Sequence, residues 1–111
     1  MSNMSLTEKK CVPCEGGILP FTREEAEEYL KMVEGWNLID GSIEREFQLK
    51  NFKEALAFIN KVGNLAESEG HHPDVLLHSY RKVKLTLSTH VIRGLRLNDF
   101  ILAAKIDMLE R

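Results

Sequence analysis

The chain has 111 residues, of which 43% are hydrophobic and 29% are charged, and its formal net charge at pH 7 is -2. This is the length of one domain with one modest core, and the composition is that of a globular protein. The charge balance argues against the concentrated basic surface that nucleic acid or an anionic membrane would require, so we expect neither partner. No apolar run approaches the roughly 18 residues of a membrane span, and the N-terminus has no apolar signal segment, so we expect a cytoplasmic protein.

Residues 1–20 show no hydrophobic period, and we predict that they form a flexible or loosely docked extension of a domain at residues 21–111. The extension contains Cys11 and Cys14 in a C-x-x-C spacing. A structural zinc site needs four ligands, and the chain has no second cysteine pair. A thioredoxin-like pair would lie between a strand and a helix. We therefore interpret the cysteines as free thiols or a local clip, without a catalytic role.

A helix and a β-hairpin are the first regular elements that the sequence predicts. Thr22 and Glu25 have the spacing of a capping box, and the helix that follows should end at Gly35. The run WNLIDGSIEREFQL then predicts two strands joined by a turn at Asp40–Gly41, because both residues tolerate positive φ. Beyond the turn, apolar and polar residues alternate, which is typical of a sheet covered on one side only.

A second amphipathic helix should begin after Asn51, which has a glutamate three residues later. Its end must precede Pro73, with Gly70 as the left-handed residue that closes it. We expect an apolar stripe of this helix to pack on the hairpin, formed by Phe52, Ala55, Leu56, Ile59, Val62, Leu65 and Ala66.

Two further strands are predicted at about residues 74–80 and 82–90, followed by a last helix with Asp99 in its first turn, where the helix dipole favours a carboxylate. Alternation along 82–90 places His90 on the polar face, at the end of the strand. The order is therefore helix, two strands, helix, two strands, helix. We predict an α+β fold, with a four-stranded antiparallel sheet and three helices packed on one face.

Three of the four histidines are expected to lie close together in the folded chain. Glu67 lies in the last turn of the second helix, His71 and His72 follow that helix, and His90 ends the last strand. A positioned histidine exchanges protons near neutral pH, which is worth roughly 10²–10⁴ in rate. Glu67 stands one turn before His71, so we expect its carboxylate to accept a ring N–H from His71 and fix the tautomer.

Two other interpretations of these histidines remain open on the pattern alone. Histidines often follow helix C-termini, where they bond the last carbonyls without further function. They could also ligate a metal together with a carboxylate, as in a metallohydrolase, although adjacent histidines point in different directions. His78 is interpreted as a sheet residue without a nearby partner.

The same residues also form a spaced motif. It begins as E-x-x-x-H-H-P at residues 67–73 and continues through Tyr80, His90 and Asp99, with the run KVKLTLSTH at residues 82–90. This motif resembles that of the pterin-4a-carbinolamine dehydratases, and the predicted order of elements agrees with the family's fold. The resemblance covers about residues 21–111.

The resemblance implies an enzyme, a hydro-lyase that dehydrates 4a-hydroxytetrahydropterin to quinonoid dihydropterin and water, without metal or cofactor, in tetrahydrobiopterin recycling. It implies that His71 and His90 transfer protons, that His72 binds or orients the substrate, and that Glu67 steers the cluster. Asp99 is interpreted as structural. The pterin pocket that the resemblance implies is lined by Gly70, His71, His72, Ser88, Thr89, His90 and Val91.

The alternative function is a non-catalytic dimerisation or transcription-coactivator module, because animal members of the family also act as partners of a transcription factor. A scaffold alone would have no need of the three histidines, so the enzyme is the leading hypothesis. In either case we expect a homodimer or homotetramer formed by strand or helix pairing, because the sheet has open edges.

Overall fold

The structure, a computed structural model, describes residues 4–12 and 18–111. Cys14 lies outside these residues, so its proposed relation to Cys11 stays a prediction. The elements in chain order are α1 (Met4–Thr7), α2 (Arg23–Leu30), β1 (Asn37–Ile39), β2 (Ser42–Gln48), α3 (Phe52–Glu69), β3 (Asp74–His78), β4 (Lys82–Leu87), the 3-10 turn η1 (His90–Ile92) and α4 (Leu97–Asp107).

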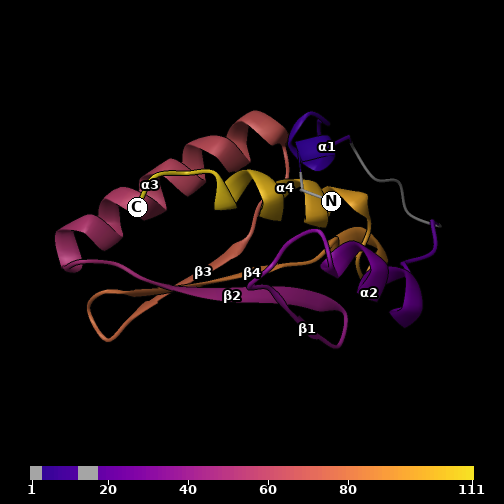
Figure 1. Ribbon diagram of the computed structural model, residues 1–111, viewed down its shortest axis with the longest axis horizontal. Coiled ribbons are helices and arrows are strands. Elements are labelled where there is room, and N and C mark those ends of the chain that lie inside the picture. The colour runs from indigo at the N-terminus through magenta and orange to yellow at the C-terminus, as the bar shows by residue number, and fades with distance from the viewer. Residues whose placement is uncertain (1–3, 13–17) are drawn as a thin grey trace.

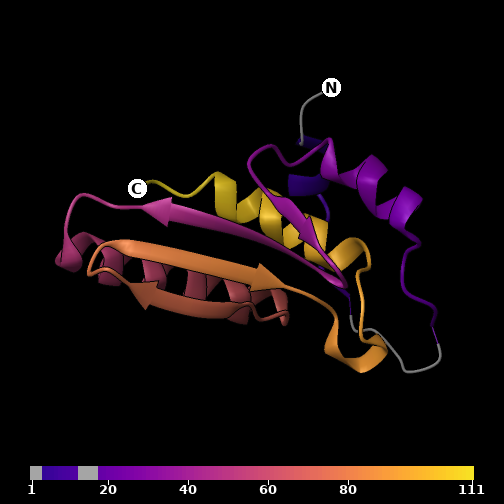
Figure 2. The ribbon, with the colours of Figure 1, turned by 90° about the horizontal axis from the view of Figure 1, so that it is seen from below.

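The four strands form one antiparallel sheet in the order β1-β2-β4-β3. Helices α3 and α4 lie on one side of this sheet, and α2 lies beside β1 (Figures 1 and 2). The predicted α+β fold, with its order of helices and strands, is confirmed. The short helix α1, which the sequence did not predict, precedes that order and packs against α4.

Local capping explains where α2 and α3 begin. The Thr22 hydroxyl accepts a hydrogen bond from Glu25 N, and Thr22 N donates to the Glu25 carboxylate, so the predicted capping box is present. Asn51 Oδ1 accepts from Glu54 N in the same manner at α3. Each cap satisfies backbone donors that the first helical turn cannot pair internally.

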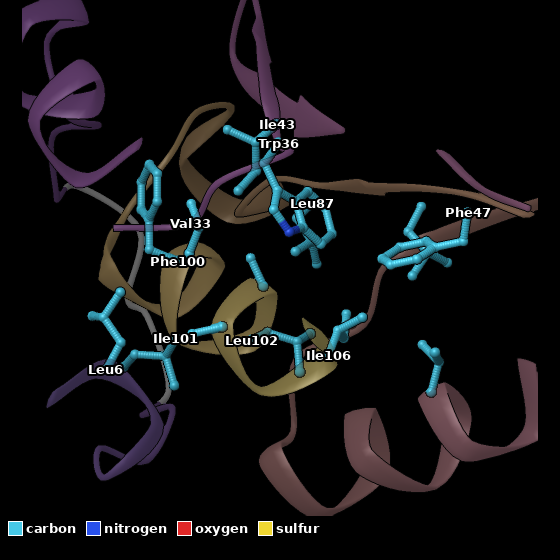
Figure 3. Close-up of a cluster of buried hydrophobic side chains, with 14 of the residues drawn as sticks. Leu6, Val33, Trp36, Ile43, Phe47, Leu87, Phe100, Ile101, Leu102 and Ile106 are labelled. Atoms are coloured by element: carbon cyan, nitrogen blue, oxygen red, sulfur yellow. The ribbon is translucent and has the colours of Figure 1, made fainter. Parts of the chain in front are cut away.

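The core lies between the inner face of the sheet and the helices (Figure 3). The predicted alternation is confirmed on β4, where every second residue is buried, and on β2, where Ile43 and Phe47 are buried and Arg45 between them is partly buried. The residues of this inner face that pack against α3 and α4 are Ile43, Phe47, Val83, Leu85 and Leu87.

The buried stripe of α3 differs from the prediction. Phe58 is buried and was not predicted, whereas Phe52 and Leu56 are 49% and 43% exposed. The helix turns the line through Phe58, Val62 and Ala66 towards the core, so positions 52 and 56 fall on its outer side. Apolar residues occur on both sides of this helix, and their spacing alone did not show which side the sheet covers.

The last two strands are shorter than predicted. β3 ends at His78, and Ser79 and Tyr80 form a turn with positive φ. β4 ends at Leu87, after which Thr89 pairs with Gly94 rather than with a neighbouring strand. His90 therefore opens a 3-10 turn instead of ending a strand, because the chain has already left the sheet.

Part of the N-terminal extension contacts the domain. Leu6 and Cys11 are buried in the hydrophobic core cluster, beside the helices. The division at residue 20 stays a prediction, but residues 4–12 pack against the helices of residues 21–111. Within the described chain, no helix is both long enough and apolar enough to cross a membrane.

Candidate active site

A pocket of about 370 Å³ opens where α3 ends, η1 begins and α4 starts. Its volume is within the range usual for small-molecule sites. Three of the four histidines of the chain line this pocket, namely the predicted residues His71, His72 and His90. The remaining lining residues are Val12, Gly70, Pro73, Asp74, Thr89, Val91 and Asn98.

The end of α3 places His71 at this pocket. Gly70 closes the helix in the left-handed conformation, with φ 68°, as predicted. Its N–H donates to the Ala66 carbonyl, and His71 N donates to the same carbonyl. A glycine is favoured here because a side chain would strain a left-handed backbone. The chain thereby turns from the helix axis into the pocket at His71.

The imidazole of His71 is held by Asp99. His71 Nε2 lies 2.7 Å from Asp99 Oδ1, and the Asp99 side chain has no exposed surface. The second oxygen, Oδ2, accepts from the Thr89 hydroxyl at 2.8 Å and from Arg96 N at 2.9 Å. An ionised carboxylate only accepts, so His71 donates Nε2–H to it. Nδ1 is then the ring nitrogen that does not contact Asp99.

The expectation that Glu67 would hold His71 is wrong. Glu67 Oε2 lies 2.6 Å from Nε2 of His72, and both side chains are exposed. The turn at Gly70 carries His71 towards α4 and His72 towards the outer side of α3, which is why the two adjacent rings bind different carboxylates. Asp99, interpreted from sequence as structural, is the residue that orients His71.

His90 and Val91 reach the pocket from η1. Both side chains are exposed, and they line the pocket together with the residues that follow α3. Thr89, one residue earlier, is buried and uses its hydroxyl on Asp99. The same carboxylate therefore ties the start of η1 to the His71 ring.

Comparison with known proteins shows the family of the chain. The family model described as pterin 4 alpha carbinolamine dehydratase matches residues 19–109. The chain belongs to the pterin-4a-carbinolamine dehydratase family. The resemblance seen in the sequence is confirmed, and with it the reaction class: a hydro-lyase that acts on a pterin.

Individual relatives agree with this assignment. A protein of Alkaliphilus metalliredigens (strain QYMF) is 53% identical over 105 residues, which cover 93% of this chain and 94% of that protein, and its name makes it a candidate pterin-4-alpha-carbinolamine dehydratase. The pterin-4-alpha-carbinolamine dehydratase 2, mitochondrial, of Arabidopsis thaliana is 44% identical over 110 residues, covering 95% of this chain and 59% of that protein. A crystal structure of a transcriptional coactivator/pterin dehydratase from Brucella melitensis is 32% identical, with a TM-score of 0.73, covering 79% of this chain and 95% of that chain.

Two residues predicted for the dehydratase site do not line the pocket. Glu67 contacts the ring of His72, and half-buried Ser88 lies one residue before Thr89. The role of Ser88 in substrate binding stays a prediction. The lining residues that sequence reasoning missed are Val12, Pro73, Asp74 and Asn98. Asn98 stands beside Asp99 in the motif, but Val12 lies in an irregular segment that carried no signal.

A second polar cluster, next to the pocket, joins the N-terminal segment to α3 and α4. Glu69 accepts hydrogen bonds from Cys11 N at 2.8 Å and from Lys105 Nζ at 2.6 Å. Burial, together with the negative charge of Glu69, raises the pKa of the Cys11 thiol to about 12. The thiol is therefore protonated at neutral pH and is a poor nucleophile.

The expectation that His78 lacks a partner is wrong. His78 Nε2 lies 2.5 Å from Glu46 Oε1 on the outer face of the sheet. His78 belongs to β3, as predicted, and takes no part in the pocket. Among residues 4–12 and 18–111, no group of three or more His, Cys, Asp or Glu side chains is arranged to hold a metal ion.

Proposed function

We propose that the pocket dehydrates 4a-hydroxytetrahydropterin, including 4a-hydroxytetrahydrobiopterin, by acid–base catalysis with His71 and His90. The observation that carries this proposal is the contact between His71 and the buried Asp99 at a pocket that His90 also lines. The membership of the dehydratase family supports the substrate class.

The reaction needs one proton donor and one proton acceptor. The bond between carbon 4a and the hydroxyl oxygen breaks, and a proton delivered to that oxygen lets it leave as water. A ring nitrogen loses its proton, and the electron pair of that N–H bond forms the new double bond to carbon 4a. One histidine donates and the other accepts, so the pair ends the reaction with the same total number of protons.

His71 and His90 suit these roles because their rings approach the pocket from different elements. His71 comes from the exit of α3, and His90 comes from η1. The contact between Nε2 and Asp99 fixes the direction of the His71 ring and leaves Nδ1 to exchange a proton. A histidine positioned in this manner contributes roughly 10²–10⁴ in rate.

His72 has a different role in this proposal. Its ring is exposed at the pocket and is held by Glu67, so it binds or orients the pterin rather than moving a proton. Glu67 is then a positioning residue for His72. Gly70, Thr89 and Val91 complete the walls around the substrate. We place the reaction in the recycling of tetrahydrobiopterin after an aromatic amino-acid hydroxylase has used it.

The purified protein, incubated with 4a-hydroxytetrahydropterin, tests the proposal. Wild type should accelerate the loss of the ultraviolet signal of the substrate, and His71→Ala and His90→Ala should each lower kcat by roughly 10²-fold or more. His78→Ala is the matched control, because His78 lies outside the pocket. The proposal fails if wild type does not exceed the uncatalysed rate, or if all three variants keep wild-type kcat.

We also propose that the chain forms a homodimer or homotetramer. The strands β1 and β3 are the two edges of the sheet, and apolar side chains are exposed on α3 and β3. Exposed apolar groups beside an unpaired strand edge favour association with a second copy. The exposed residues concerned are Phe52, Leu56, Val75 and Leu76.

A further inference from the structure

The segment Lys10–Val12 is fastened to the ends of α3 and α4, next to the pocket. Asn98, at the start of α4, binds Val12 in both directions: its Oδ1 accepts from Val12 N at 3.0 Å, and its Nδ2 donates to the Val12 carbonyl. An amide side chain can bind both backbone groups of one residue in this manner because it carries a donor and an acceptor. The backbone of Val12 is therefore fixed in position and direction.

A second contact fixes the preceding residue. Cys11 N donates to Glu69 at the end of α3, and Lys105 of α4 donates to the other oxygen of the same carboxylate. Cys11, Glu69 and Asn98 are all buried. Buried and paired polar groups define one geometry, because any other arrangement would leave them without partners.

The same two helix ends hold both this segment and His71. Glu69 directly precedes Gly70 and His71, and Asn98 directly precedes Asp99, which binds the His71 ring. Glu69 and Asn98 therefore fix the position of the segment at Val12, and each stands next to a residue that positions His71.

The side chain of Val12 is not used by the core. Val12 is 63% exposed, although both of its backbone polar groups are hydrogen-bonded to Asn98. It also lines the pocket. The rest of the wall combines polar side chains, namely three histidines, Asp74 and Asn98, with the apolar residues Pro73 and Val91. A pterin has polar edges and two apolar faces, so it needs both kinds of wall. Exposed apolar surface gains free energy when a ligand covers it.

We propose that Val12 is a substrate-positioning residue, whose side chain packs against an apolar face of the bound pterin and whose place is set by Asn98. This inference rests on the proposed function. It assigns a role in substrate binding to the N-terminal segment, outside the residues that carry the histidine motif. Val12 holds the substrate and takes no part in proton transfer.

Steady-state kinetics of Val12→Ala test this inference. The variant loses most of the side-chain contact, so KM should rise about three- to tenfold while kcat changes little, which is the signature of lost uniform binding. The Kd for dihydrobiopterin, measured by calorimetry, should rise by the same factor. Val12→Ile, which keeps a branched apolar side chain, should restore most of the affinity.

Leu19→Ala is the matched control. Leu19 is an apolar residue of the same extension, 79% exposed and outside the pocket, so its truncation should leave KM and kcat at wild-type values. Asn98→Asp, which loses the donor to the Val12 carbonyl, should raise KM as Val12→Ala does. Should that variant fail to fold, the two Val12 variants still decide.

The outcomes separate the two proposals. An active wild type with unchanged KM and dihydrobiopterin Kd in Val12→Ala would overturn the role of Val12 and leave the proposed function standing. An equal rise of KM in Leu19→Ala would also overturn it, since the effect would then belong to the extension as a whole. A wild-type protein without dehydratase activity would contradict both the proposed function and the role of Val12.

Discussion

Asp99 Oδ1 lies 2.7 Å from His71 Nε2, joining the first turn of α4 to the exit of α3. The carboxylate is fully buried, and its other oxygen accepts hydrogen bonds from Thr89 and from Arg96 N. Asp99 therefore joins His71 after α3, Thr89 before η1 and the N-cap of its own helix. Asp99 holds the tautomer and the direction of the ring that we propose as a proton carrier.

Asp99→Asn should lower kcat by roughly 10²-fold or more, with a much smaller effect on KM. An amide can present N–H to the ring, in which case Nε2 must accept and the proton moves to Nδ1, the nitrogen that should exchange it. Comparable tautomer errors cost enzymes large factors in rate. The measurement is steady-state kinetics with 4a-hydroxytetrahydropterin, beside a thermal melt.

Asp107→Asn is the control for this experiment. Asp107 lies at the other end of α4, where it accepts from Trp36 Nε1 at 3.0 Å and from Arg45 at 2.8 Å. Its loss should lower Tm without lowering kcat of the folded protein. Equal losses of kcat in both variants would show that Asp99 acts only through stability.

Glu67→Gln should have a small effect, below about threefold on kcat/KM. Glu67 and the His72 side chain it contacts are 77% and 59% exposed, and such surface pairs contribute about 0–1 kcal/mol. His72 keeps an acceptor in the glutamine amide. A loss as large as that of Asp99→Asn would contradict the assignment of Glu67 to His72 alone.

The fold could be predicted from the sequence because its determinants are local. The capping residues Thr22 and Asn51, the turn at Asp40–Gly41 and the left-handed Gly70 each act on their own neighbours. Alternation along β4, and along β2 apart from Arg45, showed one covered face. The buried side of α3 was predicted only in part: Phe58 was missed, and Phe52 and Leu56 are exposed, because apolar residues on two sides of a helix do not identify the side that meets the sheet.

The site could be predicted only in part. The motif brought His71, His72 and His90 together, but the partner of His71 was assigned to the nearer residue in sequence, Glu67. The real partner, Asp99, is 28 positions away, and its approach depends on how α4 packs. The role of Val12 in the pocket was harder to predict, because its contact with Asn98 spans 86 positions and its segment has no hydrophobic period.

Cys11 should resist alkylation in the folded protein. Burial, with the nearby charge of Glu69, raises its pKa to about 12, so almost no thiolate exists at pH 8. A Cys14→Ser variant leaves Cys11 as the one thiol, because the chain has two cysteines. Iodoacetamide should modify this variant slowly in buffer and quickly in denaturant, as followed by mass spectrometry. Fast labelling of the folded variant would show that the N-terminal segment opens readily.

Light scattering should give a mass of two or four chains, each of 12.7 kDa. Leu56→Glu places a charge among the exposed apolar residues of α3 and should shift the protein towards smaller species. Met108→Glu, a change at another exposed apolar residue, is the control and should leave the mass unchanged. A monomer for wild type would contradict the proposed oligomer.

Glu69 should make the stability of the protein depend on acid pH. Burial opposes its charge, but the hydrogen bonds from Cys11 N and Lys105 outweigh burial and hold the pKa of Glu69 below its ordinary value of 4.5. In the unfolded chain the group binds a proton near pH 4.5, and in the folded chain only at lower pH. The stability that the ionised Glu69 carboxylate contributes is therefore fully present above pH 4.5, and it is lost as pH falls through the lowered pKa. Urea unfolding of wild type and Glu69→Gln measures it: the difference in free energy of unfolding should be largest near neutral pH and shrink towards acid. A difference that stays constant from neutral pH to the acid limit of folding would show that the charge of Glu69 does not hold the N-terminal segment.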